Sequence, residues 1–396
     1  MIFFGGQIMA NSKVSKRYDQ YILKGKLRLT GFERWRYVFT ALNKSTGQEK
    51  KFFIEMYMVN PAVSPKKAVI SQKSRLAYSE ADLQYALAGT ESATHANDEL
   101  EVIPSYVLVK TGVFGLGGKH MNKFFASSLL SYTKNTETFK IGDCLFGLKA
   151  LSGSVSVTQQ DLRIRPELLC SAGSMSWDLK FEREIECEPL YSRKNYLWTP
   201  IGSKTLFSGS VNLDGEEFVV LPKSSNGYID KSWGEKLNSP YFHLSSSKMT
   251  SIISGKPMLN SSFSLEGEFG GKLCAFINIE GEEYCVENKK IFKKDMIIHD
   301  CSQITDHIEG EKVHWSVSVH KGKFVIDIDV YCKGKEMFVR DYEMSEGKRK
   351  LLKILGGTGS GEIRIYKKVR KNLELLEHAN IYDSICEFGQ TEEVGK

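Results

Sequence analysis

The strictest pattern in this 396-residue sequence lies between Val313 and Val330. Apolar residues occupy every second position over Val313–Val319, and the alternation resumes over Phe324–Val330 after the turn-prone pair Lys321-Gly322. Successive side chains of a strand point to opposite faces, so each segment predicts a strand with one apolar and one polar face. Two such segments around a short turn predict an antiparallel hairpin.

Weaker versions of this signal recur along the chain, separated by Gly, Asn, Asp and Ser. Short strands at this spacing predict a barrel or a sandwich instead of alternating strands and helices. We expect strands at Phe32–Phe39, Lys51–Val59, Thr138–Lys140, Leu145–Ala150, Gly153–Val157, Met175–Arg183, Ile185–Leu190, Phe207–Asn212, Glu216–Leu221, Leu273–Ile279, Glu283–Glu287 and Glu362–Tyr366.

The length favours two domains of about 200 residues each. Hydrophobic residues make up 41% of the sequence, so either half can bury a core. Tyr191–Gly202 is the expected join, because Pro200 and Gly202 interrupt regular structure. We therefore predict a lead-in over 1–25, an N-terminal domain over 26–200 and a C-terminal domain over 201–396. Ser79–Leu87 is the best candidate for a helix and predicts a short helical insertion in the first half.

Two glycine-rich runs superficially suggest nucleotide binding. Val113–Gly118 lacks the Lys-Ser/Thr ending of a P-loop, and Glu362 follows Gly356–Gly361 where a lysine would be needed. We expect a loop or bulge at the first run and a flexible turn at the second.

One carboxylate stands out within the apolar strand Lys51–Val59. Glu55 would be costly to bury without a partner. Arg34 or Arg36, across the predicted hairpin, is the expected partner.

The most unusual composition lies in Asn226–Glu235, where a turn-prone Asn-Gly leads into an aromatic ring, a carboxylate, an amine and an indole. In an extended chain, Tyr228 and Asp230 share one face, and Lys231 and Trp233 share the other. The residues alone allow two interpretations: a strand end with a structural Trp and a surface ion pair, or a functional site.

The pattern Gly-Tyr-x-Asp-Lys-x-Trp-Gly at 227–234 resembles the signature of the tocopherol cyclases and of the related carotenoid 1,2-hydratases. Glu33–Tyr37 is similar to the segment that opens the first barrel of that family, with one extra residue between Trp and Tyr. Cys386–Gly389 resembles the end of its last barrel strand. The resemblance implies an all-β fold of two lipocalin-like antiparallel β-barrels in tandem.

The same resemblance implies protonation of an alkene, followed by ring closure in the cyclases or addition of water in the hydratases. Lys231 matches the cyclase-like version of the signature, and the hydratase version has a His there. No redox cofactor or metal takes part, so we expect no cofactor.

Physical chemistry is consistent with that reaction. Burial raises the pKa of a carboxyl group, which can then donate a proton, and ring faces stabilise a cation. The candidate catalytic residues are Asp230, Tyr228 and Lys231. The candidate ligand-binding residues are Trp233, Trp35, Tyr37, Glu55, Tyr241 and Trp198.

Three functions remain open from the sequence. The protein is a cofactor-independent cyclase or hydratase of an isoprenoid or other polyene, a carrier of a lipid or other hydrophobic ligand, or a structural protein whose barrels are filled by their own side chains. Asp230 discriminates between the first two, and the absence of any cavity would select the third. In the enzyme Asp230 faces a cavity near aromatic rings, and in the carrier it pairs with Lys231 or an Arg at the surface.

Other site types have weaker signals. The cluster of His314, His320, Asp327 and Asp329 is explained by cross-strand pairing on a polar face, so we predict no metal site. The eight cysteines form no Cys-x-x-Cys pair, which favours reduced thiols in a cytoplasmic protein. No apolar run reaches 18 residues, and no nucleic-acid module is evident. The basic clusters Lys348–Lys350 and Lys367–Lys371 predict a solvated surface in the first place, and they also suit an anionic membrane surface or an acidic ligand.

Overall fold

The structure is a computed structural model and describes residues 23–63, 68–69, 103–135, 137–188, 191–193, 195–287, 295–307, 310–347 and 350–393. Almost all of the regular structure is β, in two large antiparallel sheets. The predicted all-β fold class is confirmed. The predicted helix at Ser79–Leu87 lies outside the described residues.

The first sheet forms the first barrel. In hydrogen-bonding order its strands are β6 (Lys119–Ala126), β5 (Tyr106–Val113), β2 (Glu49–Val59), β1 (Phe32–Asn43), β14 (Glu216–Val220), β13 (Tyr196–Leu213), β11 (Gly173–Ile185), β10 (Ala150–Val157), β9 (Cys144–Phe146), β8 (Thr138–Ile141) and β7 (Ser131–Thr133). β15 (Gly227–Gly234) pairs with β1 and β13, and β12 (Tyr191–Arg193) pairs with β13. β6 also lies against β10, so the sheet curls back on itself.

The second sheet forms the second barrel. Its order is β20 (Glu282–Val286), β19 (Leu273–Ile279), β18 (Ser262–Glu268), β16 (Tyr241–Ser246), β26 (Asn372–Glu393), β25 (Lys350–Val369), β23 (Phe324–Lys333), β22 (Gly310–Lys321) and β21 (Met296–Asp306). β17 (Lys248–Ser251) pairs with β26, and β24 (Phe338–Glu343) pairs with β25. Contacts between β20 and β22 close this barrel.

The remaining elements are short. β3 (Ala68–Val69) and β4 (Ile103–Pro104) form a parallel pair, and the described α-helix is α3 (Gln159–Ile164). The 3₁₀ turns are η1 (Gly25–Arg28), η3 (Ser127–Leu129), η4 (Pro166–Leu168), η5 (Pro222–Ser224) and η6 (Gly334–Glu336). Thr158 caps α3 in a capping box with Asp161. Over the described part of the chain, no helix has the length and apolar character needed to span a bilayer.

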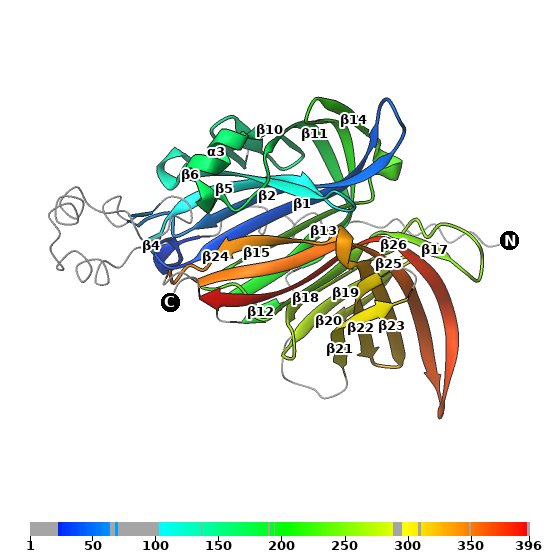
Figure 1. The fold of residues 1–396 in the computed structure, drawn as a ribbon. Coiled ribbons are helices and arrows are strands. Elements are labelled where there is room, and N and C mark those ends of the chain that lie inside the picture. Colours follow the sequence, from blue (N-terminus) through cyan, green and yellow to red (C-terminus); the bar gives the residue numbers. More distant parts are fainter. Residues whose placement is uncertain are drawn as a thin grey trace, which may run out of the picture.

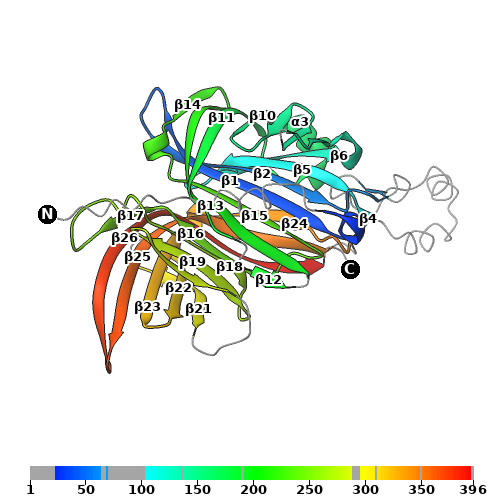
Figure 2. The same cartoon turned by 180° about the vertical axis from the view of Figure 1, so that it is seen from behind.

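The two barrels pack against each other through one side of each. Figures 1 and 2 show β1 and β15 of the first barrel next to β24 and β26 of the second. Strands change sheet between Gly234 and Tyr241. The expected domain boundary at 200 and 201 falls within β13, whose 18 residues all belong to the first barrel. The proposed domain limits stay a prediction.

The hairpins expected from the sequence are present. Trp35 lies opposite Met56 in the β1–β2 pair, and Val317 lies opposite Ile328 in the β22–β23 pair. The predicted turn at Gly356–Gly361 is wrong, because this run lies inside β25. Glycine is needed there for close strand approach: a Cβ on Gly361 would lie 1.8 Å from the carbonyl oxygen of Asp329.

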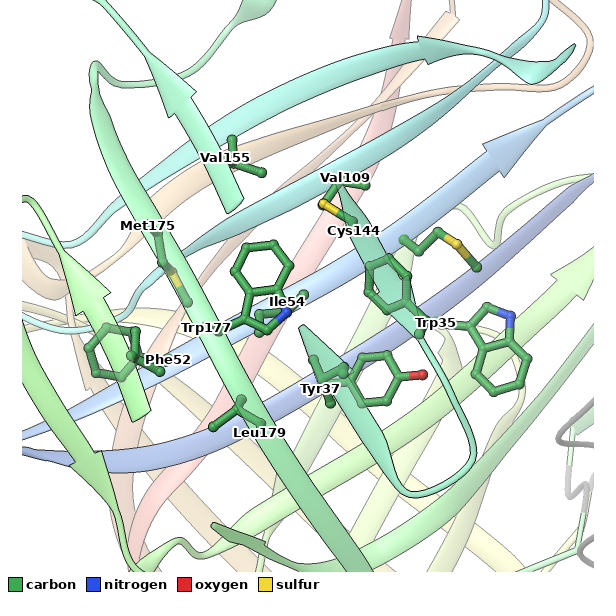
Figure 3. Close-up of a cluster of buried hydrophobic side chains, with 14 of the residues drawn as sticks. Trp35, Tyr37, Phe52, Ile54, Val109, Cys144, Val155, Met175, Trp177 and Leu179 are labelled. Atoms are coloured by element: carbon green, nitrogen blue, oxygen red, sulfur yellow. The ribbon is translucent and has the colours of Figure 1, made fainter. Parts of the chain in front are cut away.

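Each barrel is filled by its own side chains. Figure 3 shows part of the first core, where Trp35, Tyr37 and Ile54 lie among residues of neighbouring strands, with Trp177 of β11 beside them. Trp315 and Val317 belong to the core of the second barrel. The alternating pattern of β1 places Trp35 and Tyr37 inside the barrel, and therefore turns Arg34 and Arg36 outward.

Candidate functional site

β15 separates the candidate catalytic residues into two groups. It lies between β1 and β13, with Lys231 opposite Trp35 and Asp230 opposite Arg36. The predicted alternation is therefore present: Lys231 and Trp233 face the inside of the first barrel, and Tyr228 and Asp230 face the second barrel. All four side chains are buried.

On the inner face, Lys231 is held by Glu33. Its Nζ lies 2.7 Å from Glu33 Oε1, and both side chains are fully buried. The ammonium group lies 4.2 Å from the ring centre of Trp35 and 5.2 Å from that of Trp233. The Trp35 indole also donates to Glu33 Oε1 over 3.0 Å. A buried cation is stabilised here by a carboxylate and two ring faces.

On the outer face, charge alternates across four strands. Asp230 of β15 lies opposite Arg36 of β1, which lies opposite Glu55 of β2, which lies opposite Lys110 of β5. Opposite charges on neighbouring strands attract at this separation. The first barrel therefore presents a row of alternating charges to its partner.

The second barrel completes this row with charges of its own. Arg36 Nη1 lies 2.6 Å from Glu387, Arg340 Nη1 lies 2.8 Å from Glu55, and Arg34 Nη2 lies 3.4 Å from Glu266. We call the resulting set the inter-barrel network. Its four cations and four carboxylates, all described and all essentially without exposure, are Arg34, Arg36, Lys110, Arg340, Glu55, Asp230, Glu266 and Glu387.

The expected partner of Glu55 was wrong. Arg36 is its cross-strand neighbour, but the Glu55 carboxylate pairs with Arg340 and accepts from the hydroxyl of Tyr342, both on β24. The Arg36 guanidinium does not pair with Glu55 because it bonds Asp230 and Glu387 instead. The covering strand β24 comes from the distant second half, so the hairpin alone could not identify the pair.

The carboxylate of Asp230 accepts hydrogen bonds from several side chains. It accepts from Arg36 Nε over 3.2 Å, from the Tyr228 hydroxyl over 3.0 Å and from Trp198 Nε1 over 3.2 Å, and Arg36 Nη2 bonds it as well. These contacts occupy both of its carboxylate oxygens. Asp230 thus pairs with an Arg, as expected for the carrier, but it does so in the interior and not at the surface.

His243 and Glu266 lie beside Asp230. Burial, followed by Arg36, lowers the pKa of His243 to about 3. His243 Nε2 lies 3.0 Å from Arg36 Nη2, and Nδ1 lies 3.2 Å from Glu266 Oε2. We assign a neutral ring that accepts from Arg36 and donates to Glu266. Burial raises the pKa of Glu266, although Arg34 and Arg36 act against it.

The carboxyl of Glu266 also meets two phenols. Tyr241 donates to its Oε2 over 2.8 Å, and Tyr196 bonds its Oε1. Glu387 behaves oppositely: burial alone raises its pKa, but Arg36 and Arg340 outweigh burial and hold that pKa well below its usual range. Two carboxylates in one network therefore differ in proton affinity.

Asp230, His243 and Glu266 could ligate a cation together, because one atom from each lies within 4.8 Å of the others. Arg36 already supplies positive charge at that point, through its contacts with Asp230 and His243. A metal would have to displace a guanidinium held by three groups. The absence of a metal site stays a prediction.

Four charged members of the inter-barrel network, and the adjacent His243, were not predicted from the sequence: Lys110, Glu266, Arg340 and Glu387 are the four network members. Glu387 lies in the Cys386–Gly389 segment that the sequence analysis singles out, and His243 lies two residues from the candidate Tyr241. A charged residue inside a largely apolar strand, as at Lys110 in β5, is a signal that could have found another member.

A separate hollow opens at the mouth of the first barrel. It encloses about 290 Å³ of space between atoms, part of it open to solvent. Trp35 and Tyr37 line it, whereas Asp230 does not. Its other lining residues include Phe139, Phe146, Phe181, Ile201, Ile229, Leu148, Glu137 and Arg183.

Comparison with known proteins gives a likeness only to distant structures. The sequence matches no family model, and no curated protein matches it. The fold is similar to that of a putative AttH from Nitrosomonas europaea, with a TM-score of 0.43 and 11% identity, over 92% of this chain and 96% of that chain. It is also similar to kievitone hydratase from Nectria haematococca, with a TM-score of 0.42 and 9% identity, over 89% of this chain and 88% of that chain. These likenesses assign no function or ligand to the chain.

We expect Arg36→Met to destabilise the protein by roughly 3–5 kcal/mol, because it leaves Asp230 and Glu387 buried without their cation. Urea unfolding measured by fluorescence tests this. The control is Lys44→Met, since Lys44 pairs with Glu217 in an exposed position and should contribute little. Equal unfolding midpoints for the two variants would contradict the assigned role of Arg36.

Acid should weaken the protein through His243. The unfolded imidazole has a pKa of about 6.5, whereas that of the folded one is about 3. The unfolded state therefore binds the proton first, and stability is lost as the pH falls from 6.5 toward 3, by on the order of 1 kcal/mol per pH unit.

His243→Gln removes this titration, so the difference between wild type and variant should shrink as the pH falls. Urea midpoints at pH 7, 6, 5 and 4 measure it. The raised pKa of Glu266 increases stability as the pH falls, opposite to the effect of His243. The quantity to compare is therefore the difference in stability between wild type and His243→Gln at each pH. His320→Gln, in the second barrel, is the control. A pH-independent difference for His243→Gln would contradict a neutral buried His243.

Proposed function

We propose that the protein binds a hydrophobic small molecule, of isoprenoid or other lipid type, at the mouth of the first barrel. The observation that carries the proposal is the aromatic lining of the hollow over Trp35 and Tyr37. Ligand pockets are mainly apolar, with a few polar groups that orient the ligand. Glu137 and Arg183 supply such groups at this site.

As it stands the hollow has only about 10 Å³ for the centre of a water-sized sphere, far less than a small-molecule site needs. A ligand requires movement of the rings that line it. Phe139 and Phe146 lie on β8 and β9, a short hairpin near one end of the sheet order, and Phe146 stacks on Tyr37 with ring centres 6.0 Å apart. Displacement of this hairpin is the step that we propose admits the ligand.

The inter-barrel network serves a different role in this proposal. Asp230 accepts hydrogen bonds from Arg36, Tyr228 and Trp198, and it does not line the hollow at the barrel mouth. We therefore assign Asp230 and Tyr228 to the contact between the barrels. Lys231, with Glu33, supports the inner wall of the first barrel.

A second candidate function is cofactor-independent protonation of an isoprenoid or polyene, followed by cyclisation or hydration. The observation in its favour is Glu266, whose pKa burial raises and whose neighbours are the phenols of Tyr196 and Tyr241. Glu266 replaces Asp230 as the proposed acid. The aromatic rings of Tyr241 and Trp198 would stabilise the cation.

We expect Leu148→Trp to weaken binding of an isoprenoid probe such as geranylgeraniol by about tenfold or more, since the indole would fill the mouth. Leu145→Trp is the matched control, because Leu145 lies on β9, three residues before Leu148, and its side chain is exposed. Fluorescence titration measures binding, and native mass spectrometry of the purified protein detects a co-purified lipid. Equal affinities for the two variants would place the ligand elsewhere.

Catalysis is tested with prenylquinols and with wild type, Glu266→Gln and Asp230→Asn. If Glu266 donates the proton, Glu266→Gln should reduce turnover by about 100-fold. Glu55→Gln controls for loss of a buried charge in the same network. Turnover that survives Glu266→Gln, or that falls equally in Glu55→Gln, would exclude Glu266 as the acid. No turnover by wild type leaves the binding function alone.

A further inference from the structure

A second hollow lies between the barrels, on the same outer face of β1 and β2 as the network but nearer the β1–β2 turn. It holds about 650 Å³ of space between atoms, including a part open to solvent. Strands of both barrels line it: Thr40 and Lys51 come from the first, and Thr358 and Asp383 from the second. None of these residues takes part in the barrel mouth or the inter-barrel network.

Thr40 and Lys51 form a cross-strand pair at the base of this groove. The Thr40 side chain is 4% exposed, and its hydroxyl has no hydrogen-bond partner among the described residues. A buried hydroxyl without a partner costs free energy, so the groove contains an unmet hydrogen-bonding group. This unmet group points to a polar ligand atom at the Thr40 side of the groove.

The amine of Lys51 is nearly buried and donates one hydrogen bond among the described residues. Lys51 is 9% exposed, and its Nζ donates to the carbonyl oxygen of Asn226 over 2.8 Å. The carboxylates of the groove are engaged by another lysine: Lys248 lies 2.8 Å from Asp383 and 3.1 Å from Glu49. Burial, against the attraction of Asp383, lowers the pKa of Lys51 to about 8.

Asp383 reaches the groove through an irregular piece of backbone. It has φ of +49°, unusual for a residue with a side chain, and it lies where the β25–β26 register shifts. Bulges of this kind redirect a side chain and occur next to functional sites. This backbone conformation directs the Asp383 carboxylate toward Lys51 and Lys248.

One part of the groove wall is apolar. Val113 and Phe114 line it, and Phe114 packs with Phe53, Val38 and Ile385 in a buried cluster. The remaining lining is largely polar and includes Gln48, Glu49 and Lys50, so a ligand in the groove meets an amine, a hydroxyl and charged groups beside a short hydrocarbon wall. This combination fits a small molecule with one polar head and an apolar chain.

We propose that Lys51 is a reactive amine that forms a Schiff base with an aliphatic aldehyde, and that the Thr40 hydroxyl donates a hydrogen bond to the aldehyde oxygen until that oxygen leaves as water. The nitrogen lone pair attacks the carbonyl carbon, and a proton moves from nitrogen to oxygen to give a carbinolamine. Loss of water then leaves a C=N bond. Aldehyde and amine are converted to imine and water, without an oxidant or reductant.

Reductive trapping with decanal and sodium cyanoborohydride tests the proposal, because hydride converts the imine to a stable secondary amine. Peptide mass spectrometry after short exposure at pH 8 locates the modified lysines. We expect Lys51 to be trapped about tenfold faster than the exposed Lys223, because burial lowers the pKa of the Lys51 amine and the groove holds the aldehyde beside it. Trapping at Lys51 should fall as the pH is lowered from 8 to 6.5.

Lys51→Arg keeps the positive charge and should abolish the fast trapping, whereas Lys223→Arg should leave it unchanged. Thr40→Val keeps the shape and should slow it several-fold. Replacing decanal by acetaldehyde should remove most of the preference for Lys51, because the apolar wall is then unused. Urea unfolding of each variant confirms that it is folded. Trapping spread evenly over surface lysines, or a fast site that survives Lys51→Arg, would overturn the proposal.

Discussion

The contact between the barrels depends on charge placed where water is excluded. The guanidinium of Arg36 joins Asp230 of its own barrel to Glu387 and His243 of the other. Moving an ion out of water costs several kcal/mol, and only close, well-oriented partners recover that cost. The network meets this condition with equal numbers of cations and carboxylates, and its charges balance only across the contact. The first barrel brings three cations and two carboxylates, and the second brings one cation and two carboxylates.

Because of this imbalance of charge, we do not expect either barrel to be stable with its half of the inter-barrel network uncovered. Separated barrels would expose a mostly apolar surface, such as Tyr57 and Leu108, together with charges that lack their partners. Gly356 shows how closely the pieces fit. A Cβ at this position would lie 3.0 Å from Glu387 Cγ and 3.5 Å from Arg340 Nη2, so glycine leaves room for that ion pair. Packing and electrostatics therefore act on the same few residues.

The sequence predicts which residues form strands, and which face of a strand each side chain occupies, better than it predicts which side chains form ion pairs with each other. Alternation places Tyr228 and Asp230 on one side of β15 and Lys231 and Trp233 on the other, as observed. It does not say what covers each side, because the outer side is covered by strands of the second barrel that extend from Tyr241 to Glu393. Glu55 illustrates the limit. Its strand neighbour is Arg36, yet its ion pair is with Arg340, and only the docking of β24 decides between them.

The two proposed sites differ in what they require of the fold. The barrel mouth is built from strands of the first barrel alone. The affinity of a ligand there should therefore not depend on how the two barrels pack together. The groove at Lys51 has walls from both barrels, and it exists only when Thr358 and Asp383 lie against Thr40. A ligand that binds one state and not another stabilises the state it binds. Occupation of the groove should therefore strengthen the same contact that the inter-barrel network holds, whereas occupation of the mouth should not.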